Sequence, residues 1–323
     1  MADRSFFRGA ILGGAFTASH AGMISDNAYA YRVDDSDVVV EGLQSGKPHK
    51  GKVFAAIHAH LDDVPYYCSG TCAKLIDEGY TGYLIRTSND EKCGGGTTAQ
   101  NIKSNEAEHL KVAEAIGFTD TYDFYYRNHR MNVISSIEMR ARLVFLFRYL
   151  KVDTVLSFNP WGDGEENPDH WMTGRVVEEA CWMSGMGNDY PEHIEFGIKP
   201  HSVLERYYFV GRTGQPYNRV VDIGSVLDRK IQAIVECKSQ GGGDNGAILR
   251  KRLAGQGKRL PLLGNDDKTA NREYARLFHL TDDRELGSKY GLEHAEAFYY
   301  VDQRRHGKSA VDQYVDEHAE PLR

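Results

Sequence analysis

The stretch VFAAIHAHLDD, residues 53–63, joins an apolar run to a cluster of polar side chains. A short apolar run of this kind is typical of a strand buried in a parallel sheet. His60, Asp62 and Asp63 come directly after it, at the strand end, where open α/β sheets bind their ligands. We therefore expect an α/β fold with a binding or catalytic site at this point.

A second polar cluster, NPDH at residues 167–170, follows another apolar run, residues 152–158, and opens a helical stretch. Catalytic Zn²⁺ takes three protein ligands, commonly His and Asp or Glu, and keeps one position open for water or substrate. His60, Asp63 and His170 would supply such a set. Each motif alone occurs often by chance, but their matching positions after two strands favour a shared metal site.

Asp62 is the neighbour of the expected ligand Asp63. If the chain turns at the strand end, Asp62 lies beside the metal without binding it and is free to act as a base. The other interpretation is that this carboxylate only caps the helix that follows. Asp169 also has two interpretations, as a group that orients a ligand or Asn167 and as the N-cap of the helix beginning at His170.

Strand-like and helix-like segments alternate over most of the chain. The expected strands are residues 52–58, 81–87, 120–126, 152–158 and 203–210, and the expected helices are residues 67–79, 101–116, 134–150 and 170–184. This alternation predicts an α/β fold with a doubly wound, mostly parallel, Rossmann-like sheet.

After about residue 220 the pattern becomes mainly helical, with a last strand expected at 297–301. No Pro- or Ser-rich linker separates this part, so we expect one domain over residues 31–323, with a sheet core at about 50–220 and a helical extension at 221–323. Residues 1–30 have a cationic start and an apolar centre, which suits an export signal and equally an N-terminal arm. The sequence accordingly leaves an exported and a cytoplasmic location open.

Composition excludes two classes of function. The 323 residues carry a formal net charge of -7, and their 39 Lys and Arg are scattered, so we expect no nucleic-acid partner. No apolar stretch approaches the roughly 18 residues needed to cross a bilayer, so we expect no integral membrane segment. The oligomeric state is not indicated.

Taken together, the two motifs resemble those of the PIG-L/LmbE-like zinc-dependent de-N-acetylase family, whose members carry Ala-His-Pro-Asp-Asp-Glu early in the chain and His-Pro-Asp-His later. Residues 69–76 are similar to the family's Gly-Gly-Thr-Leu-Ala helix and residues 105–117 to its Glu-rich helix. Arg229-Lys230 and Ser239-Gln240 resemble its Lys and Ser-Gln element. The resemblance runs from about Val53 to Gln240.

The resemblance implies hydrolysis of an N-acyl amide, usually an N-acetyl group on an amino sugar or glycoconjugate, with Zn²⁺ as cofactor. It makes His60, Asp63 and His170 the ligands and Asp62 the general base, although such a ligand set also suits Fe²⁺ or Co²⁺. The alternatives are an amidase that acts on a larger N-acyl conjugate and a non-catalytic zinc- or carbohydrate-binding protein.

Four residues depart from the family pattern: Leu61 replaces Pro and Val64 replaces Glu in the first motif, Asn167 replaces the first His of the second, and Cys237 replaces a His before Ser-Gln. Asn167 cannot give a proton to a leaving amine, so its expected catalytic role is a hydrogen bond to the oxyanion. Protonated Asp62, or an imidazole such as His58, would then be the acid.

Trp161, Trp171, Tyr66 and Tyr67 flank the two motifs. Their rings could stack on a sugar, but aromatic side chains near a sheet end are at least as often part of the core. The sequence leaves both roles open.

Overall fold

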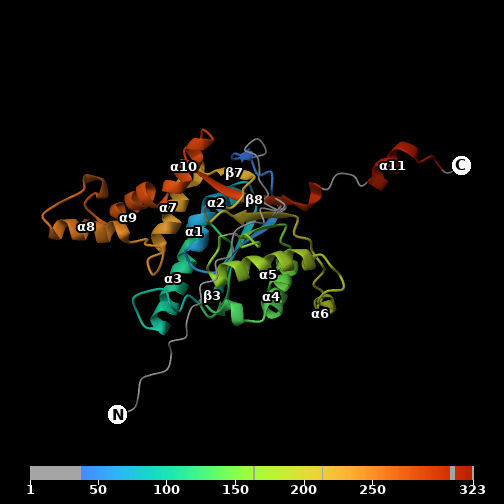
Figure 1. Cartoon of the computed structure of the whole chain (residues 1–323), viewed down its shortest axis with the longest axis horizontal. Coiled ribbons are helices and arrows are strands. Elements are labelled where there is room, and N and C mark those ends of the chain that lie inside the picture. Colours follow the sequence, from blue (N-terminus) through green and yellow to red (C-terminus); the bar gives the residue numbers. More distant parts are fainter. Residues whose placement is uncertain (1–37, 163, 213, 306–309, 322–323) are drawn as a thin grey trace, which may run out of the picture. The chain divides into compact units, whose positions relative to one another are not determined.

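In the computed structural model, which describes residues 38–162, 164–212, 214–305 and 310–321, eight strands form one sheet in the order β1-β7-β8-β6-β5-β2-β3-β4 (Figure 1). The strands are β1 (Val39–Glu41), β2 (Val53–His58), β3 (Thr81–Ser88), β4 (Asp120–Tyr126), β5 (Thr154–Phe158), β6 (Glu205–Phe209), β7 (Arg219–Asp222) and β8 (Ala295–Asp302). Only β8 is antiparallel to its neighbours, β6 and β7. The mostly parallel sheet predicted from the sequence is confirmed.

The helices form two groups. They are α1 (Asp63–Tyr67), α2 (Ser69–Asp77), α3 (Thr98–Ile116), α4 (Ser136–Leu150), α5 (Pro168–Ser184), α6 (Pro191–Glu195), α7 (Leu227–Glu236), α8 (Asn245–Gly255), α9 (Asp267–Tyr274), α10 (Thr281–Lys289) and α11 (Ala310–His318). Helices α4 and α5 pack against each other, whereas α7 packs against α2 and α3 (Figure 1). None of the helices in the described residues is long and apolar enough to cross a membrane.

The order of the strands explains this grouping. From β2 the chain moves outward to β3 and β4, then returns to the other side of β2 to form β5 and β6. Crossovers between parallel strands are right-handed, so the change of direction puts α2 and α3 on one face and α4 and α5 on the other. The change occurs between β2 and β5, and the carboxyl ends of these two strands form the place where such sheets bind ligands.

The two central strands form because their residues are apolar on both faces. In β2, Phe54, Ala55, Ala56 and Ile57 have no exposed surface, and Val155 and Leu156 of β5 beside them are equally buried. Helices cover both sides of a parallel sheet, so such strands have continuous apolar runs instead of alternating ones.

Some elements differ from the prediction. The helix expected at 67–79 is divided at Cys68, whose φ of -153° is not helical, into α1 and α2. Strands β1 and β7 were not predicted, because runs of three and four residues give no clear period. Strand β8 lies inside the sheet, so the predicted helical extension contributes a strand to the core. The signal or arm expected at residues 1–30 lies outside the described residues.

Helix α5 lies very close to the end of β5 at Gly174. A Cβ at this position would lie 2.9 Å from the carbonyl oxygen of Phe158 and 3.1 Å from that of Asn159. These oxygens belong to the backbone, which cannot easily move aside. Only glycine therefore allows this approach.

We expect Gly174→Ala to lower the free energy of unfolding by about 1–3 kcal/mol, because overpacking forces the helix away from the strand. Gly255→Ala at the end of α8 is the matched control, since a Cβ there meets nothing within 4 Å. Urea unfolding of both variants measures the effect. Equal stability of the two variants would contradict the close packing of α5.

Candidate metal centre

The two predicted motifs meet at the switch point of the sheet. His60 lies in the turn after β2, Asp63 is the first residue of α1, and His170 lies in the first turn of α5. The carboxylate of Asp63 fixes the turn, because its Oδ2 accepts hydrogen bonds from the backbone N–H groups of Ala59 at 3.1 Å and His60 at 2.6 Å. The turn thus holds His60 and Asp63, two of the candidate metal ligands, close together.

His60, Asp63 and His170 form a compact, buried set of donor atoms. His60 Nδ1 lies 3.0 Å from His170 Nε2 and 3.6 Å from Asp63 Oδ2, and His170 Nε2 lies 3.2 Å from Asp63 Oδ1. Ligands about 2.0–2.1 Å from a tetrahedral Zn²⁺ are roughly 3.3 Å apart. The three separations fit such an ion.

A carboxylate stands behind each imidazole. Asp169 Oδ2 lies 3.1 Å from His60 Nε2, and Glu165 Oε2 lies 3.1 Å from His170 Nδ1. These carboxylates favour protons on the outer nitrogens, which leaves the inner nitrogens, 3.0 Å apart, as candidate donors to a shared cation. This pairing supports the assignment of a metal centre.

The site is electronegative. Burial alone would lower the pKa of His170, but the carboxylates of Asp63 and Glu165 outweigh it and raise that pKa to about 10. Burial would raise the pKa of Asp63, yet His170 and His60 hold it well below its usual range. Asp63 is therefore an ionised ligand, and the field of the carboxylates favours a cation.

Asp62 lies beside the donor set without joining it. It occupies the N-cap position of α1, but its side chain makes no capping hydrogen bond, which argues against the purely structural interpretation. Burial and the adjacent charge of Asp63 raise the pKa of its carboxyl. A Cβ at Gly241 would lie 2.9 Å from Asp62 Cβ, so the loop after α7 packs directly against this residue.

Comparison with known families agrees with this arrangement. Residues 55–181 match the PIG-L family model, which is described as GlcNAc-PI de-N-acetylase. This match includes both motifs and all three donor residues. Residues 55–181 of the chain are thus similar to the PIG-L family.

Solved structures show a similar fold over most of the chain. N,N'-diacetylchitobiose deacetylase from Pyrococcus horikoshii superposes with a TM-score of 0.63 at 22% identity, over 84% of this chain and 91% of that chain. The hydratase GalB, which acts on 4-carboxy-2-hydroxymuconate, from Pseudomonas putida gives 0.55 at 20%, over 77% and 96%. The conserved protein TT1542 from Thermus thermophilus gives 0.56 at 18%, over 78% and 94%. No curated protein sequence matches the chain significantly.

Asn167 and Asp169 have distinct positions at the start of α5. Asn167 is the N-cap of α5, with its Oδ1 accepting a hydrogen bond from the backbone N–H of Asp169 at 3.0 Å. Asp169 is not the cap. Its carboxylate contacts His60 and accepts hydrogen bonds from the backbone N–H groups of His129 at 2.5 Å and Met131 at 3.2 Å. Asp169 therefore lies against a donor residue, and its role in orienting His60 stays a prediction, as does the action of Asn167 on a substrate.

His58, the other suggested acid, is part of the core. Its Nδ1 lies 2.6 Å from the carbonyl oxygen of His60, its Nε2 lies 3.1 Å from His109 Nε2, and the side chain has no exposed surface. Neither ring nitrogen faces the donor set, so the structure does not support His58 as the acid.

The sequence did not identify Glu165 as part of the site. Its Oε1 accepts hydrogen bonds from Arg212 Nη2 and from the backbone N–H of Asn167, both at 2.9 Å, while Oε2 faces His170. Its position two residues before the second motif was the available signal. The sequence cannot tell it from its neighbour Glu166, because only the fold shows which one points at His170.

We expect the purified protein to bind about one divalent metal per chain, and His60→Ala combined with His170→Ala to abolish binding, because two of three donors are lost. His129→Ala is the control, since its ring stands 6.0 Å from that of His60 but supplies no atom to the donor set. Elemental analysis measures the stoichiometry. A full complement of metal in the double variant would exclude this site.

We expect Glu165→Gln to weaken metal affinity by roughly 10–100-fold, the usual effect of losing a carboxylate behind a histidine ligand. Glu166→Gln changes an exposed neighbour and should have no effect. Competition with a chelator of known affinity measures both. Unchanged affinity in Glu165→Gln would mean that the carboxylate does not support His170.

Proposed function

We propose that this protein is a metal-dependent hydrolase that removes an N-acyl group, in the first place an N-acetyl group, from an amino sugar or glycoconjugate. The observation that carries the proposal is the donor set of His60, Asp63 and His170. Asp62 lies beside this set, and its carboxylate makes no capping hydrogen bond to α1. The family description, GlcNAc-PI de-N-acetylase, supports the same reaction.

We further propose Zn²⁺ as the metal, because two imidazoles and a carboxylate at these separations suit its tetrahedral coordination. When bound, Zn²⁺ would acidify a water molecule and polarise the amide carbonyl. Asp169 and Glu165 would keep His60 and His170 in the tautomers that binding requires. The same donors also suit Fe²⁺ and Co²⁺.

Asp62 would accept the proton of the attacking water as general base, and return it to the departing amine. The same carboxyl would thus serve as base and then as acid, which the lack of a His at Asn167 requires. The side-chain N–H₂ group of Asn167 would donate a hydrogen bond to the oxyanion, since its Oδ1 is already bound to the helix.

We expect Asp62→Asn to retain its metal while deacetylation falls by roughly 10²–10⁴-fold, because the side chain keeps its size and loses its basicity. Asp63→Asn is the matched neighbour and should lose metal as well. Release of acetate from N-acetylated amino sugars, followed together with metal content, measures both effects.

Near-wild-type turnover by Asp62→Asn would exclude it as the base. Activity on larger N-acyl conjugates with none on N-acetyl sugars would favour the amidase alternative. If the metal-loaded wild-type protein releases no amine from any member of such a panel, a non-catalytic binding protein becomes the better explanation.

A further inference from the structure

All three tryptophans of the chain are exposed. The exposed fraction is 51% for Trp161, 37% for Trp171 and 58% for Trp182. Burying an indole ring stabilises a fold strongly, and a ring left exposed to water does not contribute this free energy. Exposed aromatic side chains that lie together usually belong to a binding surface.

The three indoles form one row that starts beside the metal centre. Trp171 follows the donor residue His170, and Trp182 lies on the same side of α5, three turns further on. Eleven residues of helix span about 16 Å, a length of roughly three pyranose units. Trp161 comes from the loop before α5, where a Cβ on the next residue, Gly162, would lie 3.7 Å from Trp171 Cβ.

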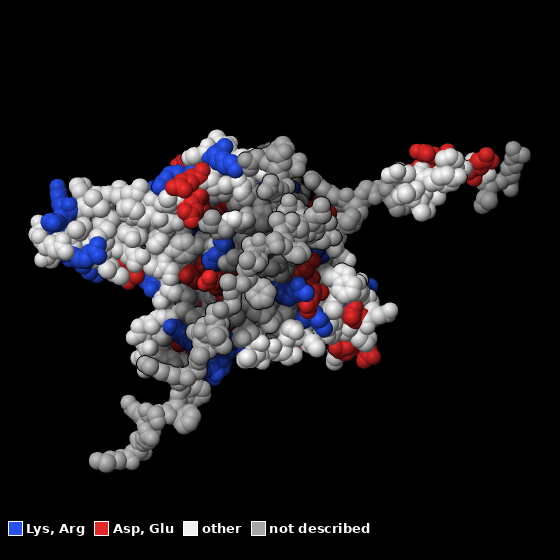
Figure 2. All heavy atoms as spheres, in the orientation of Figure 1, with Lys and Arg blue, Asp and Glu red and all other residues white. Residues whose placement is uncertain are grey.

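A groove of about 260 Å³ lies beside Trp161 and Trp182, further along α5 from Trp171. Trp161 and Trp182 line it together with charged and polar side chains: Arg175, Glu178, Glu179 and Gln303. Figure 2 shows basic and acidic groups next to each other over α5. The groove therefore alternates aromatic faces with hydrogen-bonding groups of both charges.

The Trp161 ring is held in place before any ligand binds. It packs edge-on against Tyr208 at 5.7 Å and Tyr299 at 5.1 Å between ring centres. Its backbone N–H donates to Asn159 Oδ1 at 2.8 Å, which fixes the loop. A rigid aromatic face costs little entropy on binding, so this geometry suits a ligand surface.

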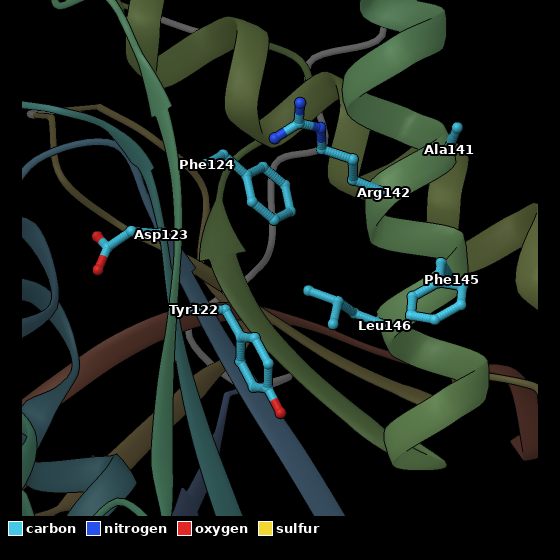
Figure 3. Close-up of a pocket in the computed structure, with 7 residues that line it drawn as sticks. All are labelled: Tyr122, Asp123, Phe124, Ala141, Arg142, Phe145 and Leu146. Atoms are coloured by element: carbon cyan, nitrogen blue, oxygen red, sulfur yellow. The ribbon is translucent and has the colours of Figure 1, made fainter.

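A second hollow in the structure differs from the tryptophan groove in the chemistry of its walls. About 480 Å³ of space lies between β4 and α4, where Tyr122 and Phe124 face Phe145 and Leu146, and Asp123 points to the other side of the strand (Figure 3). Its walls are almost entirely apolar, apart from Arg142. The tryptophan groove, in contrast, combines aromatic faces with carboxylates.

We propose that the tryptophan groove is a sugar-binding subsite and that the substrate is an oligosaccharide of about four units rather than a single sugar. The C–H faces of pyranose rings pack on indoles, while carboxylates and guanidinium groups bind their hydroxyls. The inference rests on the proposed function, since Trp171 follows the donor residue His170 on the same side of α5 as Trp182.

The test is binding of β-1,4-linked N-acetylglucosamine oligomers of one to five units to the full-length protein, measured by titration calorimetry. We expect the four- and five-unit oligomers to bind roughly 3–10-fold more tightly than the dimer, as one extra aromatic contact allows. Trp182→Ala should remove this gain and leave monomer binding unchanged. Phe145→Ala, an exposed aromatic in the other hollow, should change neither.

Acetate release from the same oligomers separates this inference from the proposed function. Deacetylation of the monomer without tighter binding of longer chains would overturn the subsite and leave the hydrolase intact. Length-dependent binding that Trp182→Ala removes, without deacetylation, would support the subsite and overturn the hydrolase. If longer oligomers still bind more tightly to Trp182→Ala, the groove is not the subsite. If no oligomer binds to the wild-type protein, the subsite is overturned as well.

Discussion

The contact between the turn after β2 and the first turn of α5 is the constraint on which the site depends. His60 and His170 are far apart in the chain, yet their ring nitrogens lie 3.0 Å from each other. They meet because β2 and β5 are paired neighbours and both connections leave the sheet at the same edge. Gly174 lets α5 lie directly on the end of β5. A shift of that helix would separate the donors without changing any of them.

The electrostatics of the donor set favour a bound cation. Asp63 and Asp169 are buried between two imidazoles and backbone N–H groups, and Asp62 is the neighbour of Asp63 in the chain. Three carboxylates close together in a buried site repel one another, and a divalent ion would offset this repulsion. Binding would then stabilise the native state as well as supply chemistry. A buried ion pair secures the turn from the other side, where Asp90 Oδ2 accepts from Arg86 Nη1 at 2.9 Å and from the backbone N–H of Leu61 at 3.1 Å.

The sequence predicted the elements whose signals are local. The central strands follow from apolar runs, and α5 was expected at 170–184, close to its observed bounds, although its cap is Asn167 and not Asp169. The donor residues were found because each follows such a strand. Glu165 was not, since its pairing with His170 depends on how the loop after β5 folds back. The place of β8 between β6 and β7 is also a long-range result, because strand pairing is not encoded in the period of one segment.

The fold alone does not determine the reaction. Two of its structural neighbours are named as a deacetylase and a hydratase, so the groups around the donors must decide the chemistry. In this chain the cap of α5 fixes Asn167, whose Oδ1 holds the backbone of Asp169. Asn167 itself cannot give a proton to a leaving group. The proposed mechanism therefore assigns proton transfer to Asp62, which packs against Gly241 and makes no capping hydrogen bond. The loop that carries Gly241 thus belongs to the proposed machinery as much as the two motifs do.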